Sequence, residues 1–426
     1  MTEQQPKDPS FGRQVMSNLG EASAASYKPM VSMDEEAALA PPGADVHSED
    51  FYLAPNWKLV WWRFKKHRLA VISSVVMIMI TITAIAPGFF ATEDPNETDA
   101  LQSFIPVQVI HFIDDGKLGP YVYGAVGQRN PTSLRIEWQI DEAVKIPVKF
   151  FTKGYPYEVL GLFTTNIHLV GVDPFEPVEV DPSAANATAG PQRVSTSLHL
   201  MGTDRLGRDQ WSRLMYGTRV SLSIGLVAVA ISTVLGIALG GISGYYGGTI
   251  DMVIQRVIEI LQSLPAIPIW LALSAALPRT WSVEQTYFAI TLILALLAWT
   301  TLAREVRSRF ITLREEDFVV AAKLSGCGQP RIIFRHMVPT FSSHIIAAVT
   351  LAIPVMIINE TFLSFLGLGL RPPAISWGVL LQEAQNLQSI ALAPWLLLPG
   401  LLVIITVLAL NILGDGLRDA ADPYTS

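Results

Sequence analysis

Residues 317–339 hold the residue types and spacing in this sequence that best suit a specific interaction. The stretch reads DFVVAAKLSGCGQPRIIFRHMVP, is polar and partly basic, and has a long apolar segment on either side. Residues 312–315 (TLRE) fit a capping box, which predicts a helix that begins there and ends before Gly326 and Gly328. A second short helix is expected to end at Pro339. A strongly hydrophobic chain that keeps such an insert presents it to a partner.

The sequence offers no motif for binding nucleotide phosphates or for a cysteine metal cluster. It has no GxxxxGK[ST] motif, so it is not expected to bind ATP phosphates by a P-loop, and energy from ATP would come from a partner. Its single cysteine, Cys327, excludes a disulfide or a cysteine metal cluster within one chain. His336 and His344 make no convincing metal pair. We therefore predict no bound cofactor or metal site.

The composition is that of a membrane protein. Hydrophobic residues make up 50% of the 426 residues and charged residues only 16%, which is too apolar for a soluble chain with a polar coat. The net charge of -7 gives no basic field that would attract nucleic acid. Six apolar segments are long enough to cross a bilayer as helices. They lie at about 69–91, 221–244, 253–277, 285–303, 343–365 and 394–413.

Basic residues set the orientation of these segments. Five bases precede the first segment within residues 57–68, among tryptophans that suit a membrane interface. Seven bases against four acids follow the fourth segment, between residues 304 and 335. Because Lys and Arg collect on the cytoplasmic side, both termini and a loop at about 304–342 are expected inside the cell.

Two regions are unlike the membrane segments. Residues 1–56 are acidic and lack hydrophobic periodicity, so we predict a disordered cytoplasmic tail. Residues 92–200 are polar and divided by prolines, and their alternating runs at 134–138 and 145–150 indicate strands. They predict a small β-rich extracytoplasmic insertion between the first two spans. This insertion either receives a binding protein or caps the membrane part.

Two patterns mark the second span and the residues before it. Residues 200–222 alternate acidic and basic side chains and are expected to lie at the outer interface. Within and just after the span, glycines recur every fourth residue and form a bare stripe on one helix face, which allows another helix to approach closely. We prefer this packing role to any catalytic one. The glycines are Gly236, Gly240, Gly244 and Gly248.

Prolines and polar residues inside the spans are the candidates for a translocation path or gate. Pro265 and Pro268 interrupt the third span, which indicates either a kink near a gate or simple packing. The fifth span contains Asn359 and Glu360, and an acid at this depth is costly unless it is paired or near water. Glu360 either contacts the solute or makes a structural hydrogen bond.

Three strings resemble the membrane subunits of ABC importers, in the variant of the dipeptide, oligopeptide and nickel permeases (the C-type permease of the pair). They are WRFKKHRLAVIS, LMGTDRLGRDQWSRLMYGTRVSL and the loop at residues 317–339. The chain departs from the family's loop pattern at Val320 and His336, which replace Glu and Ile. That pattern, EAA, three residues, Gly, nine residues, I-x-L-P, is matched at Ala321, Ala322, Gly326, Val338 and Pro339.

The resemblance implies an all-α polytopic protein of the bacterial inner membrane with six transmembrane helices. Residues 57–91 would form an interfacial segment and the first helix, and residues 201–426 the permease core. The 304–342 loop would dock in a groove of an ATPase subunit. The residues implied in this coupling are Asp317, Phe318, Ala321, Ala322, Gly326, Arg331, Arg335, His336 and Pro339.

The resemblance implies a permease that performs no bond chemistry itself, so we predict no catalytic residue. It also implies partners. They are a second homologous permease subunit, two ATPase subunits that bind ATP and Mg, and an extracytoplasmic solute-binding protein. The alternative function is an autonomous secondary transporter or channel, which would favour inverted repeats and charges near the middle of the membrane. Here the ionisable groups lie mainly at the ends of the spans. The solute stays open among peptides, nickel chelates and oligosaccharides.

Overall fold

The structure is a computed structural model of the chain and divides into two compact units, which we describe separately. One unit contains the described residues 56–67 and 419–421, and the other contains residues 68–418. The predicted tail, apart from Asn56, lies outside the described residues. The structure describes residues 56–114, 117–130, 132, 136–172, 193–195 and 197–421.

The smaller unit contains the helix α4 (Asn56–Lys66), which carries both basic and aromatic side chains. The ammonium group of Lys58 lies 5.1 Å from the ring centroid of Trp62, and that of Lys65 lies 5.3 Å from the ring centroid of Trp61. Cation–π contacts of this kind keep basic groups beside aromatic rings. The arrangement suits the interfacial role predicted for this segment.

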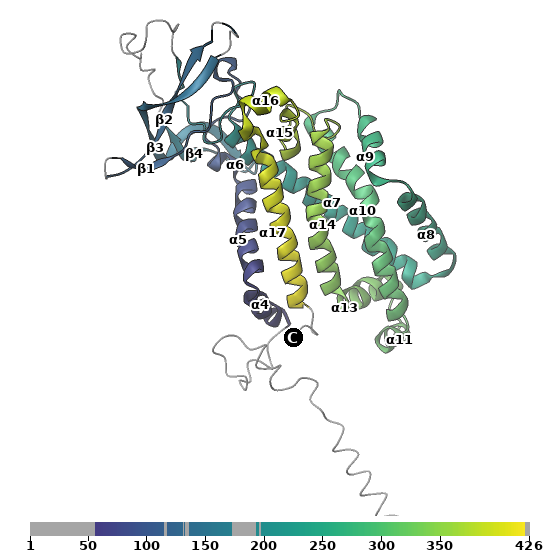
Figure 1. Ribbon diagram of the computed structural model, residues 1–426. Helices are drawn as coiled ribbons and strands as arrows, with labels where there is room; N and C mark the ends of the chain where they lie inside the picture. Colours follow the sequence, from purple (N-terminus) through teal and green to yellow (C-terminus); the bar gives the residue numbers. More distant parts are fainter. Residues whose placement is uncertain are drawn as a thin grey trace, which may run out of the picture. The chain divides into compact units, whose positions relative to one another are not determined.

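The larger unit is built around long apolar helices (Figure 1). Among the described residues, five helices are long and apolar enough to cross a membrane, and the pair α8 (Gly248–Ser263) and α9 (Ala266–Ala275), bent by 84°, makes up to six. The first helix ends earlier than expected because Pro87 begins a separate short helix, α6 (Pro87–Phe90). The five long helices are α5 (Arg68–Ile85), α7 (Gln210–Tyr246), α10 (Val283–Leu313), α14 (Ser342–Phe365) and α17 (Leu398–Ala421).

Helices α7 and α10 run parallel to each other. Near the start of both helices, the hydroxyl of Tyr287 donates a hydrogen bond of 3.0 Å to the hydroxyl of Ser223. Near the end of both helices, Gly244 lies against the backbone of Arg307. The chain between them must therefore return to the level at which α7 began.

Helices α5 and α14 run antiparallel to α7. Arg219, early in α7, donates from Nε to the carbonyl of Ala84 at the end of α5, at 2.9 Å. Ser221 donates to the carboxylate of Glu360 at the end of α14, at 3.1 Å. The helices thus share two common ends. We call them the sheet end, where α5 ends, and the loop end, where α10 ends.

The glycine stripe of α7 is the surface that α10 packs on. A Cβ added to Gly240 would lie 2.4 Å from the carbonyl oxygen of Ala303, and one added to Gly244 would lie 2.7 Å from that of Arg307. Gly236 also lies close to α10, against Leu302. The predicted close approach is confirmed for these three glycines. It is wrong for Gly248, which begins α8 with φ +57° and has no such neighbour within 4 Å.

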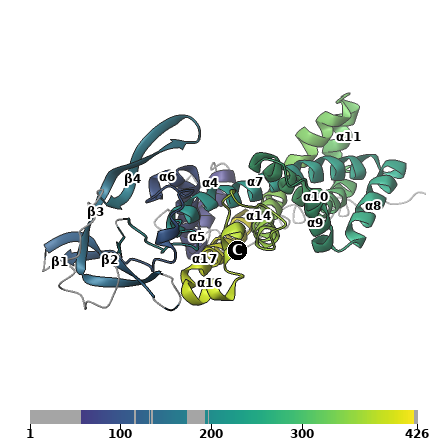
Figure 2. The same cartoon turned by 90° about the horizontal axis from the view of Figure 1, so that it is seen from above.

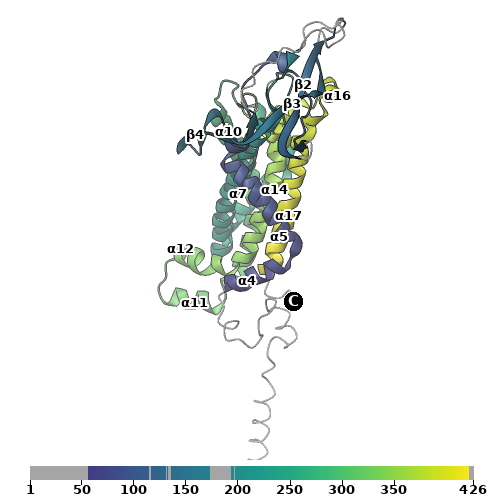
Figure 3. The same ribbon diagram turned by 90° about the vertical axis from the view of Figure 1, so that its left-hand side faces the viewer.

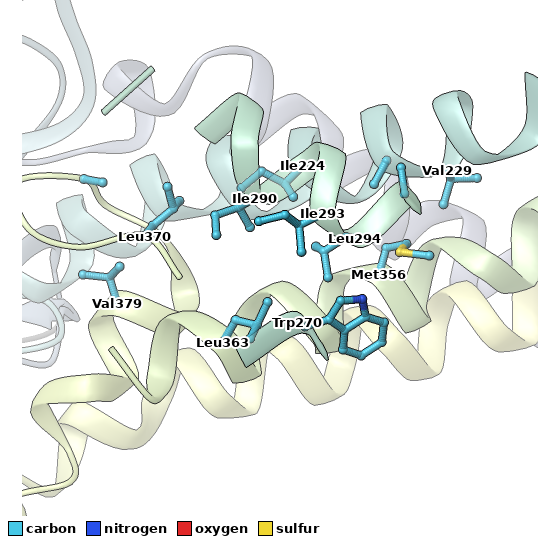
Figure 4. Close-up of a cluster of buried hydrophobic side chains, with 13 residues drawn as sticks. Ile224, Val229, Trp270, Ile290, Ile293, Leu294, Met356, Leu363, Leu370 and Val379 are labelled. Atoms are coloured by element: carbon cyan, nitrogen blue, oxygen red, sulfur yellow. The ribbon is translucent and has the colours of Figure 1, made fainter. Parts of the chain in front are cut away.

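A buried apolar cluster joins α9 to the long helices (Figure 4). The indole of Trp270 on α9 lies among side chains of α7, α10 and α14, although much of α8 and α9 is exposed. This packing fixes the second half of the bent pair within the helical bundle. The labelled members are Ile224, Val229, Trp270, Ile290, Ile293, Leu294, Met356, Leu363, Leu370 and Val379.

The predicted β-rich insertion is confirmed as a small antiparallel sheet (Figure 2). The two alternating runs expected as separate strands belong to one long strand, β3, as far as they are described. β3 pairs with β2 through its first half and with β4 through its second half, so no turn divides the runs. The strands are β1 (His111–Asp114), β2 (Lys117–Arg129), β3 (Ile136–Val159), β4 (Phe163–Val172) and β5 (Arg193–Val194).

Between α14 and α17 the chain folds back into the helical bundle at the sheet end. Trp377 at the start of α15 is fully buried, and its indole donates to the hydroxyl of Thr218 on α7 at 3.3 Å. Its backbone N–H donates to Ser221 at 3.1 Å. The segment before α17 is therefore packed against α7. The short helices at this end are η1 (Ala100–Gln102), α15 (Trp377–Glu383), α16 (Leu387–Leu392) and η3 (Pro394–Leu397).

The α7–α10 contact predicts a specific cost for a methyl group. We expect Gly240→Ala to destabilise the protein by about 1–3 kcal/mol, because the backbones would have to separate. Gly400→Ala in α17 is the matched control, since its Cβ would meet only Leu381 at an ordinary 3.4 Å. Thermal unfolding in nanodiscs measures both variants. Equal melting temperatures for the two would contradict the close contact.

Candidate functional site

The predicted docking loop lies at the loop end and is folded into short helices (Figure 1). The expected capping box is wrong, because α10 continues through Thr312 to Leu313. Packing of Phe310 in the loop's apolar core extends α10, and α11 begins at Asp317 without a side-chain cap. The helices are α11 (Asp317–Leu324), α12 (Gln329–Arg331), the π-helix η2 (Ile332–Met337) and α13 (Val338–Thr340).

One face of the loop packs inward on the helical bundle. Ala322 is only 8% exposed and lies in a cluster with Val319 on the same helix, Phe310 of α10 and Met337 of η2. Our expectation that Ala322 faces an ATPase is therefore wrong. Because successive residues of a helix point in different directions, Ala322 turns inward and its neighbour Ala321 outward.

The other face of the loop is exposed and partly apolar. Leu324 is 85% exposed, and Phe318 and Val320 are also exposed on α11. Large apolar side chains held in this way on a short helix mark an interaction surface. We call this surface of α11 the docking face. Of the predicted coupling residues, the exposed ones are Asp317, Phe318, Ala321, Gly326, Arg331, Arg335 and Pro339, and His336 is half-buried.

Gly326 ends α11 as expected. Its φ of +77° lies in the left-handed region that glycine adopts without strain. Gly328 has φ −64° and instead precedes the first residue of α12. Of these two positions, only Gly326 therefore has a backbone conformation that favours glycine.

Polar contacts fasten the loop end. Arg307 of α10 binds Asp251 of α8 through two hydrogen bonds of 2.5 and 2.6 Å, and Ser243 of α7 also donates to Asp251. A paired guanidinium–carboxylate contact fixes geometry as well as charge. Tyr246 donates to Gln329 of α12 at 2.7 Å. The docking loop is thus tied to α7 by this hydrogen bond and to α10 by its apolar core, and α8 is tied to α7 and α10.

The predicted path residues lie in two separate places. Pro265 caps α9 at the bend, while Pro268 lies in the first turn of α9, where a proline costs no helical hydrogen bond. Glu360 is fully buried and accepts hydrogen bonds from Ser221 and Ser364, at 3.1 and 2.8 Å. The structure therefore shows the hydrogen-bonding role for Glu360. Asn359 beside it is half-buried.

The charged residues before α7 form a buried cluster at the sheet end. Asp204 is fully buried and accepts a hydrogen bond of 2.6 Å from Nε of Arg208, which also pairs with Glu383 of α15. Arg213 lies 3.8 Å from the same aspartate. Asp204, Arg208 and Arg213 are therefore paired inside the fold, whereas Arg205 of the same stretch is exposed. The i, i+4 spacing of Asp204 and Arg208 was the signal for this pairing.

A second part of this cluster joins the insertion to the start of α7. His199 is fully buried, with Nδ1 3.1 Å from Asp209, the residue that caps α7 through the Ser212 N–H. Burial lowers the pKa of His199, but the Asp209 hydrogen bond and the Glu93 charge outweigh it, and the net shift is upward. Burial also raises the pKa of Glu93 to about 7, although the charge of His199 lowers it.

The raised pKa of Glu93 predicts a pH dependence of stability. The carboxyl group of Glu93 holds its proton more tightly in the folded chain than in the unfolded chain, and this stabilises the folded state. The stabilisation is complete below about pH 4.5 and is lost as the pH rises through about 7. We expect Glu93→Gln to raise the melting temperature at pH 8 and to change it little at pH 5. The exposed Glu142→Gln is the control. Parallel curves of melting temperature against pH for wild type and Glu93→Gln would contradict this account.

Two family models match parts of this chain. The family model "Binding-protein-dependent transport system inner membrane component" matches residues 236–426. The model "N-terminal TM domain of oligopeptide transport permease C" matches residues 56–106. Residues 107–235, which contain the sheet, lie outside both matches.

Curated relatives are similar over more than half of this chain. The dipeptide transport system permease protein DppC of Alkalihalophilus pseudofirmus is 41% identical over 246 residues, which are 58% of this chain and 76% of the relative. The oligopeptide transport system permease protein OppC of Bacillus subtilis is 35% identical over 226 residues, 53% of this chain and 72% of the relative.

A solved structure of the MetNI methionine ABC transporter in inward facing conformations aligns with 49% of this chain and 96% of its own, at 16% identity and a TM-score of 0.37. The family assignment rests on the family models and the curated relatives. The chain belongs to the binding-protein-dependent transport permeases, the membrane subunits of ABC importers, in the branch of dipeptide and oligopeptide permeases.

Proposed function

We propose that this chain forms one side of a path for peptides delivered by an extracytoplasmic binding protein. A second homologous permease would form the other side, and two ATPase subunits would bind ATP and Mg. The names of the relatives, dipeptide and oligopeptide permeases, support peptides as the solute class. The observation that carries the proposal is the exposed docking face of α11, held on a packed inner face at the loop end.

We propose six membrane crossings. The parallel packing of α7 and α10 supports this count, since the chain between two parallel spans must cross back. Only α8 and α9 lie between them, and Trp270 packs α9 into the bundle. The 84° bend lies inside this return crossing. Such a break suits a position buried in protein or beside a water-filled path.

The docking loop is proposed to transmit motion as a rigid lever. Its inner face shares an apolar core with α10, and Arg307, Asp251 and Ser243 join α10, α8 and α7 at the same end. Movement of a bound ATPase would therefore move all three helices together. Solute and ATP would each bias the inward and outward states through different affinities for them.

The two faces of α11 provide a matched test of docking. Ala321→Asp places a charge on the exposed docking face and should weaken ATPase binding by about tenfold or more. Ala322→Asp places the same charge in the apolar core and should instead lower the amount of folded permease in the membrane. Co-purification of the ATPase, normalised to permease in the membrane, separates the two effects. Full ATPase binding by Ala321→Asp would remove α11 as the docking site.

The proposed orientation puts the sheet outside the cell and the docking loop inside. In a Cys327→Ser background, we expect an impermeant thiol reagent to label Glu142→Cys in intact cells. Ser325→Cys should be labelled only after the membrane is opened. Both positions are exposed, so accessibility within the chain does not decide the result. The reverse labelling pattern would invert the topology.

A further inference from the structure

The hairpin formed by β3 and β4 extends past the short helix α6 at the sheet end (Figures 2 and 3). Its last cross-strand pair is Val159 with Phe163, and a three-residue turn joins them. We call residues 159–163, with the sequence VLGLF, the hairpin tip. The tip contains no charged side chain, and both flanking positions, Glu158 and Thr164, are polar.

The base of the hairpin is fixed to the ends of the membrane helices. Tyr157 is buried against Gly88 of α6, so closely that a Cβ on this glycine would lie 2.3 Å from the tyrosine ring. Tyr155 donates to the hydroxyl of Tyr216 on α7 at 3.2 Å. His168 of β4 lies 2.9 Å from the carbonyl oxygen of Ala91. These contacts determine which face of the hairpin turns towards the helices.

That face stays apolar beyond the helices. Side chains two apart on a strand share a face, and so do directly paired residues on neighbouring strands. Val159 and its partner Phe163 therefore lie on the same face as Tyr157, which packs on α6. Glu158 and its partner Thr164 lie on the opposite face. The overhanging part of the hairpin is thus amphipathic, with its apolar face on the side of the membrane helices.

The apolar side chains of the hairpin are unusually exposed. Leu162 is 78% exposed, Phe163 is 59% exposed, and Phe151, further back on β3, is 66% exposed. Phe151 and Leu160 also have positive φ values of 56° and 52°, where glycine or asparagine is the ordinary residue. A large apolar residue at a strained backbone position indicates that its side chain has a role.

The hairpin continues the surface that α5 turns towards lipid. Apolar side chains are exposed along α5 up to Ile85, at its end. α6 follows at Pro87, and the ring of Phe89 on α6 lies 6.2 Å from the ring of Phe151. The exposed apolar side chains of α5 are therefore followed by apolar rings that contact each other on α6 and on the hairpin.

We propose that the hairpin tip inserts into the lipid headgroup and acyl boundary at the sheet end. Lipid is the occupant that fits a tip without charge, on the helix side of an amphipathic hairpin, joined to a lipid-facing span. The polar face with Glu158 and Thr164 would stay in water. The inserted tip would hold the sheet at a set height and tilt over the mouth of the permease. This inference goes beyond the proposed transport function and depends only on the membrane spans.

Fluorescence quenching in nanodiscs tests the insertion directly. In the complete transporter with a Cys327→Ser permease, we would attach nitrobenzoxadiazole to Phe163→Cys or to Thr164→Cys. Thr164 is the matched control, because it is also exposed but lies on the polar face. Nitroxide lipids labelled near the headgroup should quench the probe at position 163 about twofold or more strongly than the probe at 164, as expected for an apolar group in the interface. Iodide in the buffer should show the opposite order.

Two results would overturn the proposal. Equal quenching by iodide at both positions would mean that the tip lies in water. Protection of the probe at position 163 from both iodide and nitroxide lipid would mean that protein, such as the second permease, covers the tip. A Leu162→Glu variant checks the insertion of a tip that carries no probe. With the probe at Phe151→Cys, this variant should reduce the quenching of the probe by nitroxide lipid. Unchanged quenching at position 151 would also contradict insertion of the tip.

Discussion

The close contact between α7 and α10 is the constraint on which the rest of the membrane part depends. Without side chains at Gly240 and Gly244, the two backbones approach until a single Cβ would collide with a carbonyl oxygen. Lipid gives helices no hydrophobic reason to associate, so such packing contacts decide which helices pair and in which direction. Because the two helices are parallel, the segment between them has to return through the bundle. The bent pair α8 and α9 lies in this segment, and we propose that it forms the return crossing.

The same contact positions the docking loop. The C-terminal turns of α10 lie on the last turns of α7, and Phe310 continues from there into the core under α11. Arg307 makes its contact with Gly244 through the backbone and binds Asp251 through the side chain. One stretch of α10 thus holds α7, α8 and the docking loop. A force applied to α11 has a short packed route into the helices that form the proposed path.

The sequence predicted the structure correctly where a residue pattern directly reflects helix geometry or backbone conformation. A glycine every fourth residue lies on one helix face, and a glycine after a helix adopts the left-handed conformation, as Gly326 does. It failed where the answer depends on which face meets a neighbour. Ala321 and Ala322 are identical in type, and only the packing of α11 separates an exposed residue from a buried one. Thr312 fits a capping box locally, but tertiary packing extends α10 past it.

The charged residues at the sheet end show the same limit more clearly. Asp204, Arg208 and Asp209 belong to a charge-alternating stretch whose pairing partners cannot be identified from the sequence alone. Their partners, His199, Glu383 and the N-terminus of α7, come together only after the insertion and α15 have folded around them. Buried hydrogen bonds of His199 and Asp209 therefore join the insertion that contains the sheet to the start of α7. A boundary at residue 200, as the sequence suggested, would cut through this cluster.

Transport by the reconstituted complex tests the central claim most directly. The chain would be reconstituted into proteoliposomes with its partner permease and ATPases, with binding protein and a radiolabelled dipeptide on the sheet side and ATP on the loop side. The account predicts accumulation of dipeptide that requires ATP and binding protein and is abolished by Ala321→Asp. Accumulation that proceeds without ATP, or is unaffected by Ala321→Asp, would contradict an importer driven through the docking face of α11.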